Sequence, residues 1–132
     1  MQFEFIEEDG SSYIEFTVID ILDSIMRQSG SHNSFYDMTN GLIASVILNF
    51  ANPPTFTITL DPTSWVQGDT YIIVHLEREG TFTWSSVDND RVTAGRGGTV
   101  RLSSENSGRH RIRLHNPSGH RVTGDIRIAW AS

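Results

Sequence analysis

Apolar and polar residues alternate in a series of short runs along the second half of the chain. Phe56, Ile58 and Leu60 alternate with threonines, and the same alternation recurs at residues 81–85, 99–103, 111–115 and 125–130. Because neighbouring side chains of a strand point to opposite faces, each run places its apolar residues on one face. Aromatic and β-branched residues are enriched in these runs, as is typical of strands. The pattern predicts strands with one buried face.

Turn residues separate the runs. Asn-Pro-Pro at 52–54, Gly95-Arg96-Gly97-Gly98 and Asn-Pro-Ser-Gly at 116–119 are typical turn sequences. Residues 71–76 are more continuously apolar, which favours a central strand, and residues 86–91 are predicted as a loop. We therefore predict one all-β domain over residues 1–132, a β-sandwich or jelly roll of about 8–9 antiparallel strands.

The first half is less regular. Residues 3–18 fit a hairpin around a turn at 8–11, and residues 42–50 fit a strand. The spacing of the apolar residues in the segment 20–28 also fits one short helix. Residues 29–40 are mostly polar and are predicted as a loop.

Composition excludes several kinds of chemistry. The chain contains no cysteine, which excludes a disulfide scaffold, thiolate catalysis and cysteine-ligated metals. All ten of its basic side chains other than histidine are arginine, so it has no lysine for Schiff-base or P-loop chemistry. No apolar run approaches about 18 residues, so no membrane span is expected. No secretory signal is visible at the start of the chain.

Charge divides the chain into two parts. Residues 1–90 hold 14 acidic residues and 2 arginines, so their formal charge is −12, whereas residues 91–132 hold 8 arginines and 2 acids, a formal charge of +6. Such a division indicates either an anion-binding surface or internal ion pairs. A nucleic-acid partner is not expected, because the net charge is −6 and no nucleic-acid motif is present.

The densest basic segment lies at residues 109–115. On a strand, one face would carry Arg109, Arg111, Arg113 and His115, which we call the arginine ladder. Ile112 and Leu114 would then face the core. Guanidinium groups about 6.5–7 Å apart suit carboxylate, sulfate or phosphate groups. We therefore expect the ladder to be the candidate binding site for an anionic glycan, peptide or protein surface.

Internal pairing is the alternative for the ladder. Glu77 and Glu79 share one face of the predicted strand 71–79. If that strand neighbours the ladder, the acids and arginines would form cross-strand ion pairs and explain the charge division without a ligand.

Two other candidates are weaker. Trp65 lies among polar residues and could offer a sugar-binding platform, or it could hold its own segment against the core. Asp88 and Asp90 supply closely spaced oxygens for calcium, although calcium requires more ligands than these two. No other cofactor is expected. No catalytic motif is recognised, so enzymatic activity is left open, with its absence favoured.

Residues 105–130 read as a turn, a strand, an Asn-Pro-Ser-Gly turn and a final strand. This arrangement resembles the end of secreted bacterial β-sandwich modules such as pre-peptidase C-terminal domains and related jelly rolls. The resemblance implies a non-catalytic accessory domain, extracellular or at the cell surface and in some cases calcium-stabilised, although a cytoplasmic place remains an alternative. The alternative functions are a structural protein that forms homo-oligomers through complementary charged surfaces and a carbohydrate-active hydrolase.

Overall fold

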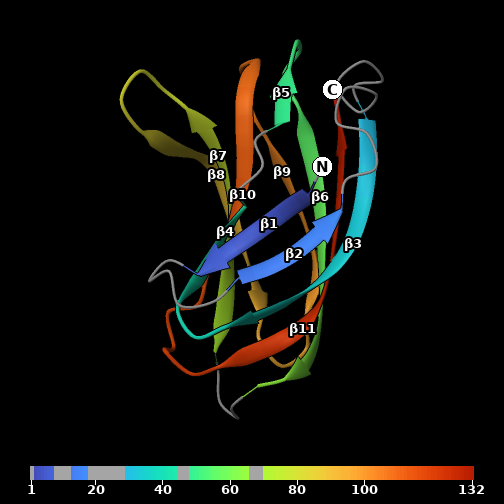
Figure 1. Ribbon diagram of the computed structural model, residues 1–132, viewed down its shortest axis with the longest axis vertical. Helices are drawn as coiled ribbons and strands as arrows, with labels where there is room; N and C mark the ends of the chain where they lie inside the picture. The colour runs from blue at the N-terminus through green and yellow to red at the C-terminus, as the bar shows by residue number, and fades with distance from the viewer. Residues whose placement is uncertain (1, 8–12, 18–28, 45–47, 66–69) are drawn as a thin grey trace.

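The alternating runs form strands of two antiparallel sheets that pack face to face (Figure 1). The computed structural model describes residues 2–7, 13–17, 29–44, 48–65 and 70–132. The described residues contain strands and turns and no helix, so the predicted all-β sandwich is confirmed. The short helix suggested for 20–28 lies outside the described residues.

The larger sheet has seven strands. Their order is β2 (Tyr13–Thr17), β1 (Gln2–Glu7), β4 (Gly41–Ala44), β10 (Gly108–His115), β7 (Tyr71–Glu79) and β8 (Trp84–Thr93), with β5 (Leu48–Phe50) paired to β10. The central strands β7 and β10 are adjacent and antiparallel.

The smaller sheet has four strands. Their order is β3 (Ser29–Met38), β11 (Val122–Ala131), β6 (Thr55–Ser64) and β9 (Gly98–Ser103). Figure 1 shows β3, β11 and β6 running side by side along this sheet. Neighbouring strands of this sheet therefore bring together residues more than sixty positions apart in the sequence, as the pairing of Asp125 with Asp61 illustrates.

The core is the apolar layer between the sheets. Burial alternates strictly along β10 from His110 to Leu114 and along β11 from Val122 to Trp130. The buried apolar side chains of the central strands are at most 4 % exposed and include Phe56, Ile58, Leu60, Ile72, Val74, Leu76, Ile112, Leu114, Ile126, Ile128 and Trp130. Burying a side chain of this size contributes roughly 1.5–3 kcal/mol, so this layer fixes which residues point inward.

The predicted loop at 29–40 is wrong, because residues 29–38 form β3. This strand has few apolar residues, and its neighbour supplies part of the packing. The Trp130 ring lies over Gly30, where an added Cβ would come within 2.6 Å of the ring, and Tyr36 lies over Gly124 in the same way. At these positions a glycine makes room for a large aromatic side chain from the neighbouring strand, so the apolar side chain expected from the alternation is absent. Within the predicted strand at 42–50, the described residues form β4 and β5, and residues 45–47 lie outside the described part of the chain.

The segment 81–91 also differs from its prediction. Residues 86–91 belong to strand β8 rather than to a loop. Phe82, predicted to alternate into the core, lies in the β7–β8 turn and is 98 % exposed. Trp84 is half-buried beneath the guanidinium of Arg111 rather than in the core. The turn extends over residues 80–83, where the Gly80 N–H donates to the Thr83 carbonyl at 2.8 Å, so the strand begins only at Trp84.

A buried histidine occupies β10 between the ladder arginines. His110 is fully buried, with one ring nitrogen 2.8 Å from the Gly108 carbonyl and the other 2.8 Å from the Ser104 hydroxyl. Its ring also meets Phe50 edge to face. A carbonyl can only accept, so Nδ1 of the ring donates to Gly108. The Ser104 hydroxyl lies within hydrogen-bond distance of both Nε2 and the Asn106 carbonyl. Burial, with the nearby positive charge of Arg78, lowers the pKa of His110 below its ordinary value of 6.5.

We predict that acidification through pH 6.5 destabilises the fold in part through His110. The unfolded chain binds a proton more readily than the folded chain in this range, so the stabilisation is complete above pH 6.5 and is lost as pH falls toward the lower folded pKa. Urea unfolding of wild type and His110→Gln between mildly alkaline and mildly acidic pH measures the difference. His110→Gln should show a flatter pH dependence, and the exposed control His120→Gln should not. Equal slopes for wild type and His110→Gln would contradict this assignment.

Candidate functional site

The arginine ladder lies on the outer face of the seven-stranded sheet. Along β10, Arg109, Arg111, Arg113 and His115 point outward while the residues between them are buried. The predicted shared face is therefore confirmed. The neighbouring strand decides whether that face is open to a ligand.

Two ladder arginines are held in ion pairs with β7. Nε of Arg111 lies 2.8 Å from Oε1 of Glu77, and these side chains are only 19 % and 9 % exposed. The Arg111 guanidinium also stacks 4.2 Å from the centre of the Trp84 ring. Arg109 and Glu79 are 3.0 Å apart at a more exposed position. Internal pairing thus holds for both arginines, because β7 and β10 are adjacent and in register.

The rest of the ladder is also engaged or covered. Arg113 stands opposite His75 and His115 stands opposite Ile73. Arg113 and His75 both have further interaction partners. Nδ1 of His115 is buried and has no hydrogen-bond partner among the described residues. The ladder therefore does not present three open guanidinium groups to an anion.

Trp65 follows β6 directly and covers a glycine. An added Cβ on Gly95, in the β8–β9 turn, would lie 2.6 Å from the Trp65 indole nitrogen. The side chain is 44 % exposed. This contact favours the interpretation that Trp65 holds its segment against the fold.

The two candidate calcium ligands lie on β8. The Asp88 carboxylate accepts backbone N–H groups of Asn89 at 2.9 Å and of Ser103 at 2.8 Å, and the second bond links the edges of the two sheets. The Asp90 carboxylate accepts the N–H of Arg91. Within the described part of the chain, no three His, Cys, Asp or Glu side chains are grouped so as to hold a metal. The Asp88 oxygens are thus engaged in joining the sheets.

A different surface lies on the outer face of the four-stranded sheet, across β3, β11 and β6. We call it the Phe35 surface, and it consists of Asn33, Phe35, Thr59, Asp61, Asp125 and Arg127. In the register of the sheet, Asp125 stands between Phe35 on β3 and Asp61 on β6. Arg127 stands between Asn33 and Thr59 in the next outward row. Two rows of side chains thus cross three strands.

The charged groups of this surface have no ion-pair partner in the described part of the chain. The side chains of Asn33, Asp61, Asp125 and Arg127 make no hydrogen bond or ion pair with any residue that the structure describes. Like charges directly opposite each other on neighbouring strands destabilise a sheet by roughly 0.2–1 kcal/mol, and Asp61 faces Asp125 in this way. The carboxylates also contribute, after burial, to raising the pKa of Tyr36 on the inner face.

An exposed aromatic side chain completes the surface. Phe35 is 56 % exposed, at a position of β3 that points away from the core. A hollow lies beside it in the sheet, lined by Asn33, Thr59, Asp61, Asp125 and Arg127 among others. Its volume is about 190 Å³, less than the roughly 300–1,000 Å³ of pockets that enclose a small molecule. The geometry suits a ligand that lies across the sheet rather than one that is enclosed.

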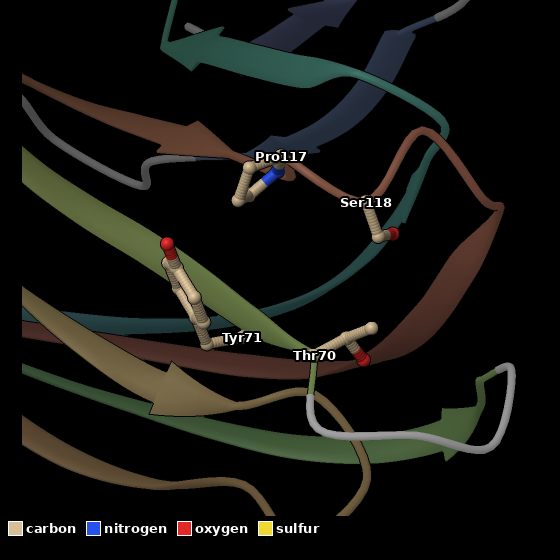
Figure 2. A pocket seen from close by; sticks show the side chains of 4 residues that line it. All are labelled: Thr70, Tyr71, Pro117 and Ser118. Carbon is tan, nitrogen blue, oxygen red and sulfur yellow. The ribbon is translucent and has the colours of Figure 1, made fainter.

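A second hollow opens at the start of β7, and Figure 2 shows Tyr71 on one side of it and Pro117 and Ser118 on the other. Two of its lining side chains are already engaged. The Ser118 hydroxyl lies 2.7 Å from the Asn116 side-chain oxygen, and the Tyr71 ring is covered by the Arg91 guanidinium at 4.5 Å. Buried Asn116 also donates to the carbonyls of Thr39 and His120. The hydrogen bonds at this end of the sandwich thus mainly hold neighbouring turns together.

Sequence reasoning missed the Phe35 surface as a unit. The outward positions of Asp125 and Arg127 follow from the alternation of residues 125–130. Asn33 and Phe35, however, lie in a segment predicted as a loop, and Asp61 lies on β6 directly after the alternating run that ends at Leu60. Only the register of three strands brings these residues together.

Comparison with protein-family models, with curated proteins and with solved structures finds no match. The resemblance to secreted β-sandwich modules therefore stays an expectation. Among the residues that the structure describes, none forms a helix long and apolar enough to cross a membrane.

We predict that the two ladder ion pairs differ in their contribution to stability. Arg111→Ala would leave the nearly buried Glu77 without its partner and remove the contact with Trp84, which should lower the free energy of unfolding by about 1.5–3 kcal/mol. Arg109→Ala, at the exposed pair, is the matched control and should cost at most about 1 kcal/mol. Urea unfolding gives both values, and equal losses would show that the Arg111 pair is no better protected than its neighbour.

Proposed function

We propose that this protein is a non-catalytic binding module that recognises a glycan through the Phe35 surface. The observation that supports this most is the contrast between the two outer faces. On the seven-stranded sheet, Arg109 and Arg111 pair with acids. Beside the exposed Phe35 ring, by contrast, the Asn33, Asp61, Asp125 and Arg127 side chains have no partner among the residues that the structure describes. Charged groups kept at a cost to stability favour a role in binding.

The chemistry of the surface suits sugars. A Phe ring offers an apolar plane for the C–H face of a sugar ring, while carboxylate, amide and guanidinium groups exchange hydrogen bonds with its hydroxyl groups. All of these groups project from strands, so a packed sheet positions them. An extracellular or cell-surface place fits this function and remains part of the proposal.

A hydrolase is the second candidate, for one specific reason. Asp61 and Asp125 are direct register partners, and side chains at such positions have Cβ atoms about 4.5–5.5 Å apart. Two carboxylates at about 5–5.5 Å are the arrangement of retaining glycosidases. The shallow hollow favours binding over hydrolysis, because catalytic carboxylates work in sites that enclose the scissile bond.

The test is affinity electrophoresis of the whole chain through gels that contain a soluble polysaccharide, with hydroxyethylcellulose, xylan, mannan, pectin and heparin as the panel. We predict that at least one polysaccharide retards the wild type and that Phe35→Ala loses this retardation by at least about tenfold in affinity. Phe82→Ala is the matched control, because Phe82 is also a strongly exposed Phe and lies far from the surface in sequence and sheet.

Retardation that depends on Phe82 rather than Phe35, or no retardation by any member of the panel, would contradict the proposal. Release of reducing sugar from the bound polysaccharide, lost in both Asp61→Asn and Asp125→Asn, would instead establish the hydrolase.

A further inference from the structure

Resting on the proposed function, we infer that the Phe35 surface selects an uncharged, hydroxyl-rich saccharide chain and rejects anionic glycans. This is the reverse of what the basic half of the sequence suggests. The inference concerns the ligand class at the surface where Phe35, Asp125 and Asp61 form one row across β3, β11 and β6.

The first argument is the local charge. The surface carries two carboxylates, Asp61 and Asp125, against one guanidinium, Arg127. Arg121 is already paired with Asp37 of β3 through two bonds of 2.7 and 2.6 Å, so its positive charge is balanced. A uronate or sulfate placed in this row would meet two like charges, and the chain as a whole carries a formal charge of −6.

The second argument is hydrogen-bonding capacity. Ionised carboxylates only accept, and two of them offer about eight lone-pair sites that need donors. Sugar hydroxyl groups supply donors without bringing charge, and they can accept from Arg127 and from the Asn33 amide in the adjacent row. Thr59 is less available, because its hydroxyl lies 2.9 Å from that of Thr99 on β9. A neutral saccharide satisfies both the acceptors and the donors of the surface.

The third argument is length and direction. Neighbouring strands lie about 4.8 Å apart, so the row from β3 to β6 spans roughly 10 Å, which is the length of a disaccharide. The aromatic ring stands at one end of this row, on the edge strand β3, and the carboxylates follow on β11 and β6. A chain that stacks one ring on Phe35 would place the next ring over Asp125 and Asp61, across the strands.

The experiment is isothermal titration calorimetry of the full chain with hexasaccharides of defined charge. The neutral probes are cellohexaose, xylohexaose and mannohexaose, the anionic probe is hexagalacturonate, and the cationic probe is the glucosamine hexamer. We expect at least one neutral probe to bind with an affinity that changes little between low and high salt, and at least about tenfold more tightly than hexagalacturonate. Phe35→Ala should abolish this binding and Phe82→Ala should leave it intact.

A double variant tests the argument from local charge. Asp61→Asn/Asp125→Asn should weaken binding of the neutral probe by about tenfold, because charge-assisted hydrogen bonds are replaced by neutral ones. The same double variant should narrow the discrimination against hexagalacturonate. Arg101→Gln, which changes another outward residue of the same sheet at β9, is the control and should change neither. Thermal unfolding of each variant establishes that it is folded.

The outcomes separate the inference from the proposed function. Binding of hexagalacturonate or of the glucosamine hexamer at least as tight as that of every neutral probe, and lost in Phe35→Ala, overturns the inference and leaves the glycan-binding function in place. No binding of any probe through Phe35 overturns both.

Discussion

The apolar layer between the two sheets determines where every outward side chain of the sandwich can lie. Because successive residues of a strand point to opposite faces, burial of Ile112 and Leu114 in β10 forces the arginines between them outward. Burial of Ile126 and Ile128 in β11 does the same for Arg127. A slip of one residue would place guanidinium groups in the core. The charge pattern of both outer faces therefore follows from the packing of the inner ones.

The two outer faces use that constraint differently. In the seven-stranded sheet, β7 and β10 bring acids opposite arginines, and the Arg111–Glu77 pair is nearly buried beside Trp84. In the four-stranded sheet, β6 and β11 bring Asp61 opposite Asp125. The first arrangement stabilises the fold and the second costs it stability. This difference, rather than the number of charges, distinguishes the face that serves structure from the face proposed to serve binding.

Sequence periodicity was sufficient where a strand is covered along its whole length. The strands at 55–60 and 111–115 alternate as predicted because the opposite sheet covers them, and residues 71–76 lie in a central strand as their apolar run predicted. It failed for β3, where Gly30 receives Trp130 instead of contributing a side chain of its own. It failed again in β8, where Asp88 bonds to the backbone of Ser103 at the joined edges of the sheets. In both places tertiary contacts replace the apolar residue that the pattern requires.

The candidate site was less predictable than the fold, for a related reason. The ladder lies within one strand, so its shared face could be inferred, and its ion pairs were one of two alternatives. The Phe35 surface depends on the register of three strands whose contributing residues lie near positions 35, 61 and 125. No local pattern encodes that register. The charge totals indicated a binding site in the basic segment. Because Arg109 and Arg111 of that segment pair with acids, the opposite sheet is the better candidate.

The central claim is that the carboxylates of the Phe35 surface are kept for a ligand and not for the fold. The free energy of unfolding of Asp125→Asn, measured in urea at low salt, tests it most directly. We predict that the variant is more stable than the wild type by a few tenths to about 1 kcal/mol, because the repulsion from Asp61 is removed. A loss of stability would mean that Asp125 supports the sheet and would contradict the account.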